Sequence, residues 1–485
     1  MGAVMHEADG KTLTRRTLLG GSVAGATLLA GRANAQRKSR QPNVIMFLAD
    51  DLGAADIGCY GAPQIRTPAI DAIAAAGARF TQAYANSAVC TASRVGIITG
   101  RYQYRLAIGL EEPLSAVSDV GLPPEQPTLP SLLRKAGYST YLVGKWHLGS
   151  LPKYGPLKSG YDHFWGFRGG ALDYFSHQSN GKPDLWDDDS AVESKGYLTT
   201  LIGGRAAEIV RSQAASNKPY FISVHFNAPH WPWEGPEDEA HSKEIGPNIS
   251  DPQGAKLATY NRMVEAMDQQ IGAVLRALEQ TGQADNTIVI FTSDNGGERL
   301  SNTWPFTGKK TELLEGGIRI PSIVRWPGRF RADLVSPQVM IHMDWLPTLL
   351  AACGGQPDPG SPSDGINLLL KLTEGVAATP RTLFWRYKSN QQRAVRDGDY
   401  KALKIGTHGY LFNVVDDPLE RSDLKTKHPD IYQRLTGAWN DWNRAMLSET
   451  ADANTYNNSA ATWADHINTP PIDRRAYDDG SPWPL

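Results

Sequence analysis

The chain has 485 residues, and its 49 lysines and arginines nearly balance its 51 aspartates and glutamates, for a formal net charge of −2. This near-balance, without a long block of like charges, argues against nucleic-acid binding and against a polybasic membrane-binding face. A chain of this length usually forms one large domain with a smaller one, or two domains of moderate size. Three cysteines, Cys59, Cys90 and Cys353, cannot form a closed disulfide framework. We therefore expect small-molecule partners and a fold held without disulfides.

The first 35 residues are typical of an export signal. TRRTLL (residues 14–19) resembles the twin-arginine motif, residues 18–30 are weakly apolar, and ANA (residues 33–35) supplies a small-residue cleavage site. The apolar part is too short and too broken by glycine to span a bilayer. The alternative, a disordered basic tail, does not explain why three signal regions occur in the right order. We predict a signal peptide over residues 1–35, export by the bacterial twin-arginine machinery, and a periplasmic or secreted protein without stable membrane insertion.

Four segments of the mature chain share one pattern, in which a short apolar run ends directly in polar residues. They are residues 43–51, 138–147, 220–230 and 287–297. Near-continuous apolar runs are typical of strands buried on both faces, and helical patterns over 67–77, 130–135 and 257–280 lie between them. This alternation predicts an α/β fold with a large, mostly parallel sheet sandwiched by helices. The polar clusters should then meet at one edge of the sheet, outside the carboxyl ends of the strands.

A second pattern begins after residues 354–380, which are rich in Pro, Gly, Ser and Asp. Short alternating runs at 382–387, 392–396, 400–405 and 410–415, with Asp397-Gly398 at one turn, predict an antiparallel meander. A helix from about 429 to 446 should pack across one of its faces. We place a main α/β domain at residues 36–375, a smaller C-terminal subdomain of antiparallel sheet and helix at 376–460, and an irregular tail at 461–485.

Oxygen ligands follow two of the buried runs. Asp50 and Asp51 end the first run, and Asp294 and Asn295 end the fourth. Adjacent carboxylates at a buried strand end are costly unless a cation neutralises them. Carboxylate and amide oxygens suit Ca²⁺ or Mg²⁺ better than zinc, although each pair alone is also consistent with an ordinary turn beside glycine. Together the two pairs predict a divalent-cation site, with Ca²⁺ favoured and Mg²⁺ as the alternative.

A second set of candidate residues is cationic or can carry protons. It consists of Arg94, Lys145, Lys310, His147 and His230. A single lysine is usually solvated, and a single histidine at a strand end is often structural. Fixed positive charges beside a metal stabilise the oxygens of a transferred sulfuryl group as they do those of a phosphoryl group, and histidines can move protons. Sulfate esters explain such a set.

Cys90 lies in the run NSAVCTASR (residues 86–94). A free cysteine ahead of a helix is usually a small buried hydrophobe. The run is nevertheless similar to the sulfatase signature Cys-x-Pro/Ala-Ser-Arg, with Ala92 in place of the commoner Pro. Five further segments, in order, resemble motifs of the formylglycine-dependent, arylsulfatase-like sulfatases of the alkaline phosphatase superfamily. They are residues 42–53, 144–149, 227–230, 293–297 and 310–321.

The resemblance implies hydrolysis of aryl, carbohydrate or alkyl sulfate esters by the domain at 36–375. It implies that a formylglycine-generating enzyme oxidises Cys90 to formylglycine, whose hydrate binds the metal and attacks sulfur. The metal ligands that it implies are Asp50, Asp51, Asp294, Asn295 and the modified Cys90. Arg94 and Lys145 would assist the nucleophile. Lys310 and His230 would hold the sulfate and protonate the leaving alcohol or phenol. His147 would accept the proton that lets sulfate depart by elimination.

Two alternatives remain open at this point. A phosphonate or phosphate ester hydrolase of the same superfamily uses similar groups, although the presence of Lys145, His147 and Lys310 favours sulfate. An exported, metal-stabilised binding protein would leave Cys90 as an inert thiol. Loops set the substrate of such enzymes. Candidate rim residues are Glu111, Glu112, Asp173, Tyr174, His177 and residues 231–234.

Overall fold

The structure is a computed structural model that describes residues 41–116, 118–249, 256–450, 453–456 and 482–483. The predicted signal peptide and most of the predicted tail lie outside the described residues. The described residues from 42 onward form one compact unit. No helix within the described residues combines the length and apolarity needed to cross a membrane.

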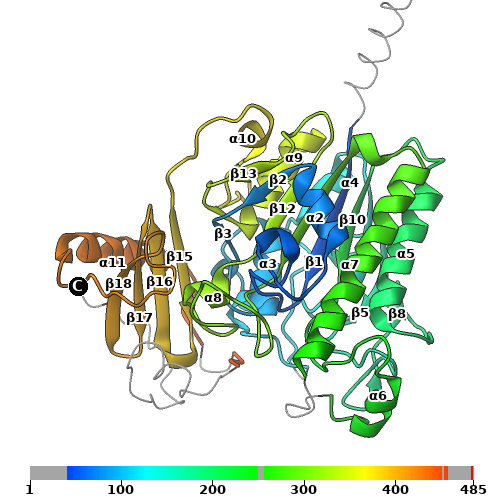
Figure 1. The fold of residues 1–485 in the computed structure, drawn as a ribbon, viewed down its shortest axis with the longest axis horizontal. Coiled ribbons are helices and arrows are strands. Elements are labelled where there is room, and N and C mark those ends of the chain that lie inside the picture. Colours follow the sequence, from blue (N-terminus) through cyan, green and yellow to red (C-terminus); the bar gives the residue numbers. More distant parts are fainter. Residues whose placement is uncertain (1–40, 117, 250–255, 451–452, 457–481, 484–485) are drawn as a thin grey trace, which may run out of the picture. The chain divides into compact units, whose positions relative to one another are not determined.

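One large sheet forms the centre of this unit (Figure 1). Its strands are β1 (Asn43–Ala49), β2 (Ala78–Phe80), β4 (Ser139–Lys145), β5 (His163–Phe167), β8 (Trp186–Asp187), β9 (Ser190–Ala191), β10 (Tyr220–His225), β11 (Thr287–Ser293), β12 (Ser322–Arg325) and β13 (Leu334–Ser336). They lie in the order β13-β2-β12-β11-β1-β10-β4-β5-β8-β9. The strands from β11 to β5 run parallel, whereas β12 is antiparallel to both of its neighbours. The four runs that the sequence singled out are therefore adjacent central strands.

Helices cover both faces of the sheet because its central strands are apolar on both sides. In β1, Ile45 and Phe47 pack in one core cluster with residues of α2 (Pro68–Ala75), α5 (Leu198–Gln213) and α7 (Leu257–Gln280). Val44 and Met46 pack in another cluster with residues of α3 (Cys90–Thr99), α4 (Leu129–Lys135) and α9 (Trp345–Cys353). Each such fully buried side chain contributes about 1.5–3 kcal/mol of transfer free energy. The predicted α/β fold with helices on both faces of a mostly parallel sheet is confirmed.

A smaller antiparallel sheet follows in the chain. Its strands are β15 (Thr382–Tyr387), β16 (Gln392–Asp397), β17 (Tyr400–Ile405) and β18 (His408–Asn413), paired in that order. Helix α11 (Pro429–Asn443) packs on it through Leu435 and Trp439 (Figure 1). The predicted meander and helix are confirmed, although α11 ends three residues earlier than expected. The domain boundary at residue 375 stays a prediction.

Several short elements were not predicted. They are β3 (Ala83–Tyr84), β6 (Gln178–Ser179), β7 (Lys182–Pro183), α6 (Glu239–Ile245), α8 (Glu315–Ile318), β14 (Met340–Ile341) and α10 (Leu369–Thr373). Each is too short to show a helical or strand period in the sequence. Two of them join the small sheet to the main unit, because Tyr84 of β3 packs against Trp385 of β15 with ring centroids 5.2 Å apart, and Glu315 of α8 pairs with Lys401 of β17.

Candidate active site

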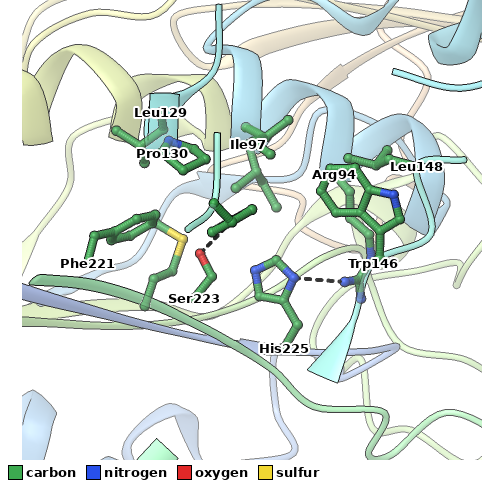
Figure 2. Close-up of a pocket in the computed structure, with 12 residues that line it drawn as sticks. Arg94, Ile97, Leu129, Pro130, Trp146, Leu148, Phe221, Ser223 and His225 are labelled. Atoms are coloured by element: carbon green, nitrogen blue, oxygen red, sulfur yellow. Dashed lines mark hydrogen bonds between the residues drawn. The ribbon is translucent and has the colours of Figure 1, made fainter. Parts of the chain in front are cut away.

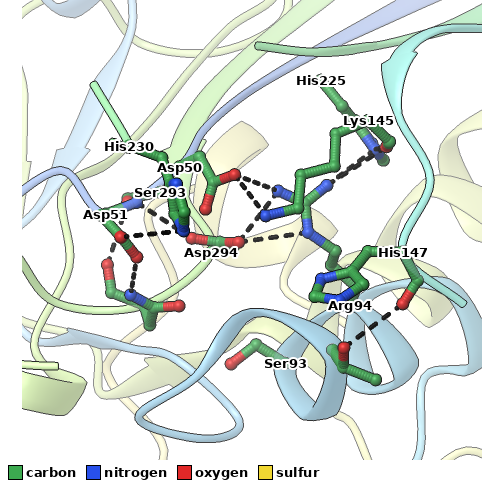
Figure 3. Close-up of polar contacts among 12 residues, drawn as sticks. Asp50, Asp51, Ser93, Arg94, Lys145, His147, His225, His230, Ser293 and Asp294 are labelled. Atoms are coloured by element: carbon green, nitrogen blue, oxygen red, sulfur yellow. Dashed lines mark hydrogen bonds and ion pairs between the residues drawn. The ribbon is translucent and has the colours of Figure 1, made fainter. Parts of the chain in front are cut away.

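The carboxyl ends of the four central strands bring the predicted residues together (Figure 3). Asp50 and Asp51 follow β1, Asp294 and Asn295 follow β11, His147 and His230 lie beyond β4 and β10, and Lys145 is the last residue of β4. Cys90 begins α3, one turn before Arg94, and Lys310 precedes α8. None of these ten side chains is more than 4% exposed. The sheet therefore gathers all of the predicted site residues, from segments far apart in the chain, into one buried cluster.

Three cations of this cluster face three carboxylates. Lys145 Nζ lies 2.5 Å from Asp50 Oδ2, and Lys310 Nζ lies 2.6 Å from Asp51 Oδ2. The Arg94 guanidinium donates to Asp294 Oδ2 through Nε at 3.1 Å and Nη2 at 2.9 Å. Buried charges persist only where an opposite charge and hydrogen bonds compensate the loss of water. The pairing thus fixes three positive charges close to the start of α3.

The backbone at Asp51 is held in an uncommon conformation. Asp51 has a φ of +66°, in the left-handed region that few non-glycine residues adopt. Its N–H donates to Asp294 Oδ1 at 3.3 Å, and Asn295 Nδ2 donates to its Oδ1 at 2.8 Å. Local strain of this kind persists where surrounding contacts impose it, and it is common at functional sites. Both contacts come from residues that follow β11, so the two strand ends fix each other.

The cluster fits a divalent cation. Asp50 Oδ1 and Asn295 Oδ1 are buried and accept no hydrogen bond within the described part of the chain. One ligand atom each from Asp50, Cys90 and Asp294 lie within 4.8 Å of one another, as do ligand atoms of Asp50, Asp51 and His230. A buried oxygen without a partner costs about 1–3 kcal/mol, which coordination of a hard cation offsets. The donor set is therefore consistent with the predicted site.

Burial and neighbouring charges shift the protonation of the site. Burial raises the pKa of the Cys90 thiol, and it also raises the pKa of Asp294, where the charge of Asp50 adds to the effect. Burial lowers the pKa of His147, and the charge of Lys145 lowers it further. Burial and then Lys310 lower the pKa of His230. Both histidines are therefore neutral at neutral pH in this arrangement.

The polar residues around Cys90 shape the start of α3. Ser93 Oγ donates to the Ser87 carbonyl at 2.8 Å and accepts from the Ser87 N–H at 3.0 Å, which folds the preceding loop back on the helix. Thr91 Oγ1 donates to the His147 carbonyl at 3.3 Å. A Cβ at Gly96 would lie 2.3 Å from the Asn86 side chain, so the loop can lie against α3 only because this position is glycine. Each polar residue of the run thus has a structural task beside any chemical one.

A family model described as Sulfatase matches residues 42–355, well over half of the chain. The chain belongs to the sulfatase family. An N-acetylgalactosamine-6-sulfatase of Rattus norvegicus is 32% identical over 486 aligned residues, which cover 87% of this chain and 89% of that protein. Arylsulfatase J of Mus musculus is 30% identical over 470 aligned residues, which cover 84% and 76%. The crystal structure of Ps i-CgsB in complex with k-i-k-neocarrahexaose matches with a TM-score of 0.78 at 28% identity, covering 86% of this chain and 96% of that one. This sulfatase is accordingly a hydrolase of sulfuric esters.

One residue of the sulfatase site escaped prediction. His225, the last residue of β10, places Nδ1 3.0 Å from the Lys145 carbonyl and 3.3 Å from Arg94 Nη1. Burial lowers its pKa to about 3, so it stays neutral beside the guanidinium. It lines a cavity of ≈ 10 Å³ behind Arg94, together with Ile97, Trp146, Phe221 and other core residues (Figure 2). That volume has room for about one water molecule, so the cavity belongs to the core and not to substrate binding.

Several of the expected rim residues are buried, and that part of the prediction is wrong. Asp173 and Tyr174 are 0% exposed, and His177 is 4% exposed. Tyr174 Oη donates to the His230 carbonyl at 2.9 Å, and its N–H donates to Glu234 Oε2 at 3.0 Å. Tyr174 therefore supports the His230 loop, whereas His177 contacts the Gly196 carbonyl.

Glu234 allows a test of this support by pH. Burial raises its pKa to about 9, with the charge of Asp173 as the next cause. The pKa of Glu234 is thus higher in the folded protein than in the unfolded chain. The stability that its carboxyl group contributes is therefore complete below pH 4.5, and it is lost progressively as the pH rises to about 9. Glu234→Gln keeps an acceptor for the Tyr174 N–H without a charge. We expect it to raise the free energy of unfolding by on the order of 2–3 kcal/mol at pH 8 and to change it little at pH 5. Urea unfolding at the two pH values measures this, and an equal effect at both would contradict it.

Proposed function

We propose that this sulfatase hydrolyses sulfate esters of carbohydrates with a formylglycine made from Cys90 and a Ca²⁺ ion, Mg²⁺ being the alternative. The observation that carries the proposal is the position of Cys90, at the first residue of α3 and within 4.8 Å of Asp50 and Asp294 ligand atoms. The carbohydrate class is supported by similarity to an N-acetylgalactosamine-6-sulfatase and to a sulfatase-fold structure with a bound neocarrahexaose. The residues that would hold the cation are Asp50, Asp51, Asp294 and Asn295, together with the modified Cys90.

The cation and the hydrated formylglycine together supply an activated oxygen nucleophile, which a cysteine thiol cannot provide. The protein supplies the charges around it. Arg94 and Lys145 are held by Asp294 and Asp50, so they keep positive charge at the start of α3 without reorganisation. Lys310, held by Asp51, binds the oxygens of the sulfate group. The positive end of the α3 dipole favours an anion at the same place by about 0.3–1 kcal/mol.

Hydrogen bonds assign the proton-carrying atom of each histidine. His147 Nε2 lies 3.1 Å from the Leu114 carbonyl and therefore carries the hydrogen, which leaves Nδ1 as a proton acceptor. Nδ1 is buried and has no other partner among the described residues, so we assign it the role of base. His230 Nδ1 lies 2.7 Å from the Trp231 carbonyl, which leaves Nε2, 3.6 Å from Asp51, to face the site. This Nε2 carries no proton in the neutral ring, so the proton that passes to the leaving oxygen comes from Lys310, either directly or through His230 Nε2.

Maturation and export complete the proposal. A formylglycine-generating enzyme would modify Cys90, and the pattern of residues 1–35 supports export of the folded protein by the twin-arginine route to the periplasm or medium. We assign residues 36–375 to the catalytic domain and 376–460 to the C-terminal subdomain.

Mass analysis of the peptide that contains Cys90 tests the proposal directly. Protein made in a bacterium with a formylglycine-generating enzyme is expected to carry formylglycine at position 90 and to hydrolyse 4-nitrophenyl sulfate. A chelator should abolish this activity, and Ca²⁺ or Mg²⁺ should restore it. An active enzyme with an unmodified thiol would refute the mechanism. Faster hydrolysis of 4-nitrophenyl phosphate or of a phosphonate ester than of the sulfate would favour the alternative reaction.

A further inference from the structure

One hydroxyl group contacts both His147 and the loop that meets its ring. The Leu114 carbonyl lies 3.1 Å from His147 Nε2, and the Leu114 N–H donates to Thr91 Oγ1 at 3.0 Å. Thr91 Oγ1 in turn donates to the His147 carbonyl at 3.3 Å. Thr91 directly follows Cys90 in α3. The residue after the proposed nucleophile therefore joins the start of α3 to the surroundings of the proposed base.

The chemistry of a hydroxyl allows both of these bonds. Its single hydrogen is donated to the His147 carbonyl, and a lone pair of the same oxygen accepts the Leu114 N–H. The Thr91 side chain is fully buried, so both bonds are made away from bulk water. A side chain of the same shape without a hydroxyl would leave the Leu114 N–H and the His147 carbonyl without this partner.

Other contacts fix the residues directly before Leu114. The Glu112 N–H donates to the Asn454 carbonyl at 2.9 Å, and Asn454 Nδ2 donates to the Pro113 carbonyl at 2.7 Å. The Glu112 carboxylate, which is buried, accepts from the Lys388 N–H at 2.9 Å. The loop is thus anchored as far as Pro113, and Thr91 anchors the next residue, Leu114.

The His147 ring has little room to turn away from the Leu114 carbonyl. A Cβ at Gly170 would lie 2.6 Å from His147 Nε2, so the chain at Gly170 lies directly against the ring. The backbone of His147 has a φ of +55°, and its N–H donates to the Arg168 carbonyl at 3.2 Å. A carbonyl oxygen only accepts, so the neutral ring carries its hydrogen on Nε2 and keeps Nδ1 as an acceptor. This tautomer lasts as long as the Leu114 carbonyl stays in place.

We infer that Thr91 is a positioning residue for His147. Its hydroxyl holds the Leu114 carbonyl on Nε2 and thereby keeps Nδ1 available to accept a proton. Without the hydroxyl the carbonyl is no longer held, and the ring hydrogen can move to Nδ1, which then cannot act as a base. The inference rests on the proposed function for the role of His147, whereas the tautomer itself belongs to the protein whether or not Cys90 is modified.

The tautomer can be measured without any activity. The sample is full-length protein with unmodified Cys90 and ¹⁵N-labelled histidine, and nitrogen NMR reports which ring nitrogen carries the hydrogen. The signals that disappear in His147→Gln belong to His147. Wild type and Thr91→Ser, which keeps a hydroxyl, should carry the hydrogen on Nε2. Thr91→Val should show it on Nδ1 or exchanging between the two nitrogens, and an unchanged Nε2 hydrogen in this variant would overturn the inference.

Kinetics with 4-nitrophenyl sulfate give the second readout. Thr91→Val should lower kcat per formylglycine by about 10–100-fold and change KM by less than about 3-fold, whereas Thr91→Ser should stay within about 3-fold of wild type. Mass analysis of the peptide that contains residue 90 counts the formylglycine in each variant, so incomplete modification is not mistaken for a slow reaction. The matched control is Thr99→Val, because Thr99 is a buried threonine of the same helix whose hydroxyl donates to the Val95 carbonyl at 2.6 Å. Its kinetics should equal those of wild type.

The first turnover separates a displaced base from a general defect. Departure of the phenol does not need His147 as a base, whereas release of sulfate does. Thr91→Val should therefore produce a burst of about one 4-nitrophenol per formylglycine before its slow steady rate. A first turnover slowed as much as the steady rate, or a kcat equal to that of wild type, would overturn the inference and leave sulfate-ester hydrolysis intact. Wild-type enzyme with formylglycine at position 90 that hydrolyses no sulfate ester would refute the proposed function, and the NMR measurement would still decide whether Thr91 sets the tautomer.

Discussion

Replacement of Cys90 by alanine is expected to lower kcat/KM for 4-nitrophenyl sulfate by about 10⁴-fold or more, because it removes the only side chain from which the proposed nucleophile can form. Arg94, Lys145 and Lys310 remain in place, but they act on charge that develops at the reacting group and cannot replace it. Cys90→Ser should be equally inactive under multiple turnover. A serine has one hydroxyl and cannot collapse to an aldehyde to release sulfate. Initial rates of protein from a host with a formylglycine-generating enzyme measure both losses.

The matched control for this prediction is Cys353→Ala. Cys353 is a buried thiol at the end of α9, 0% exposed, in a core cluster on one face of the sheet. Its loss should cost a small amount of stability and leave the rate unchanged. Both alanine variants should keep a cooperative thermal unfolding transition, because each removes one small side-chain atom. A Cys90→Ala enzyme that retains a hundredth or more of the wild-type rate would contradict the assigned nucleophile.

Much of the fold could be read from the sequence because its signals are local. The apolar runs at 43–49 and 287–293 could be recognised as buried strands, and the apolar spacing of residues 257–280 has the helical period. The carboxyl ends of parallel strands lie at one edge of the sheet. The strand assignments alone therefore predicted that four side chains lie close together, those of Asp50, Lys145, His230 and Asp294. The chemical role of each residue remains a prediction.

Other parts of the structure were not predicted, or were predicted wrongly, because they depend on contacts between segments that are distant in the sequence. Thr455 forms a bridge with Glu112, which lies far earlier in the chain, and no local pattern in the sequence predicts this contact. Asp173 was expected at the rim because it is a polar loop residue. The N–H groups of Phe175 and Ser176 satisfy its carboxylate locally, and the distant contact is with Ser242 Oγ, which donates to the same carboxylate. Tertiary pairing of this kind leaves no period or turn signal in the sequence.

The charge cluster around Lys401 shows the same principle with a large energetic consequence. Lys401 on β17 is 0% exposed, and its Nζ lies 3.0 Å from Glu315 Oε1 and 2.9 Å from Glu420 Oε1. Glu420 Oε2 in turn accepts from the Glu315 N–H at 2.6 Å. Glu315 begins α8, five residues after Lys310. A single buried lysine thus joins the small sheet to the segment that carries an active-site cation.

Lys401→Met is expected to lower the free energy of unfolding by about 3–5 kcal/mol at pH 8, because it leaves two buried carboxyl groups without their shared cation. Burial raises the pKa of Glu420 to about 7 even with Lys401 present, and loss of the lysine raises it further. Acids with a raised folded-state pKa contribute stability that is lost as the pH rises, so the variant should be less impaired at pH 5.5 than at pH 8. Urea unfolding at both pH values measures the difference.

The control is Lys243→Met, which breaks an exposed helical pair with Glu239 in which the lysine side chain is 73% exposed. Surface pairs of this kind are worth about 0.3–0.5 kcal/mol, so this variant should unfold almost as the wild type does at both pH values. Adding Glu420→Gln to Lys401→Met removes the carboxylate that the lysine loss leaves without a cation, since Glu315 still pairs with Arg319. The double variant should therefore recover part of the lost stability at pH 8. If the single and double variants were equally unstable, the loss would come from packing around the lysine stem and not from the buried carboxylates.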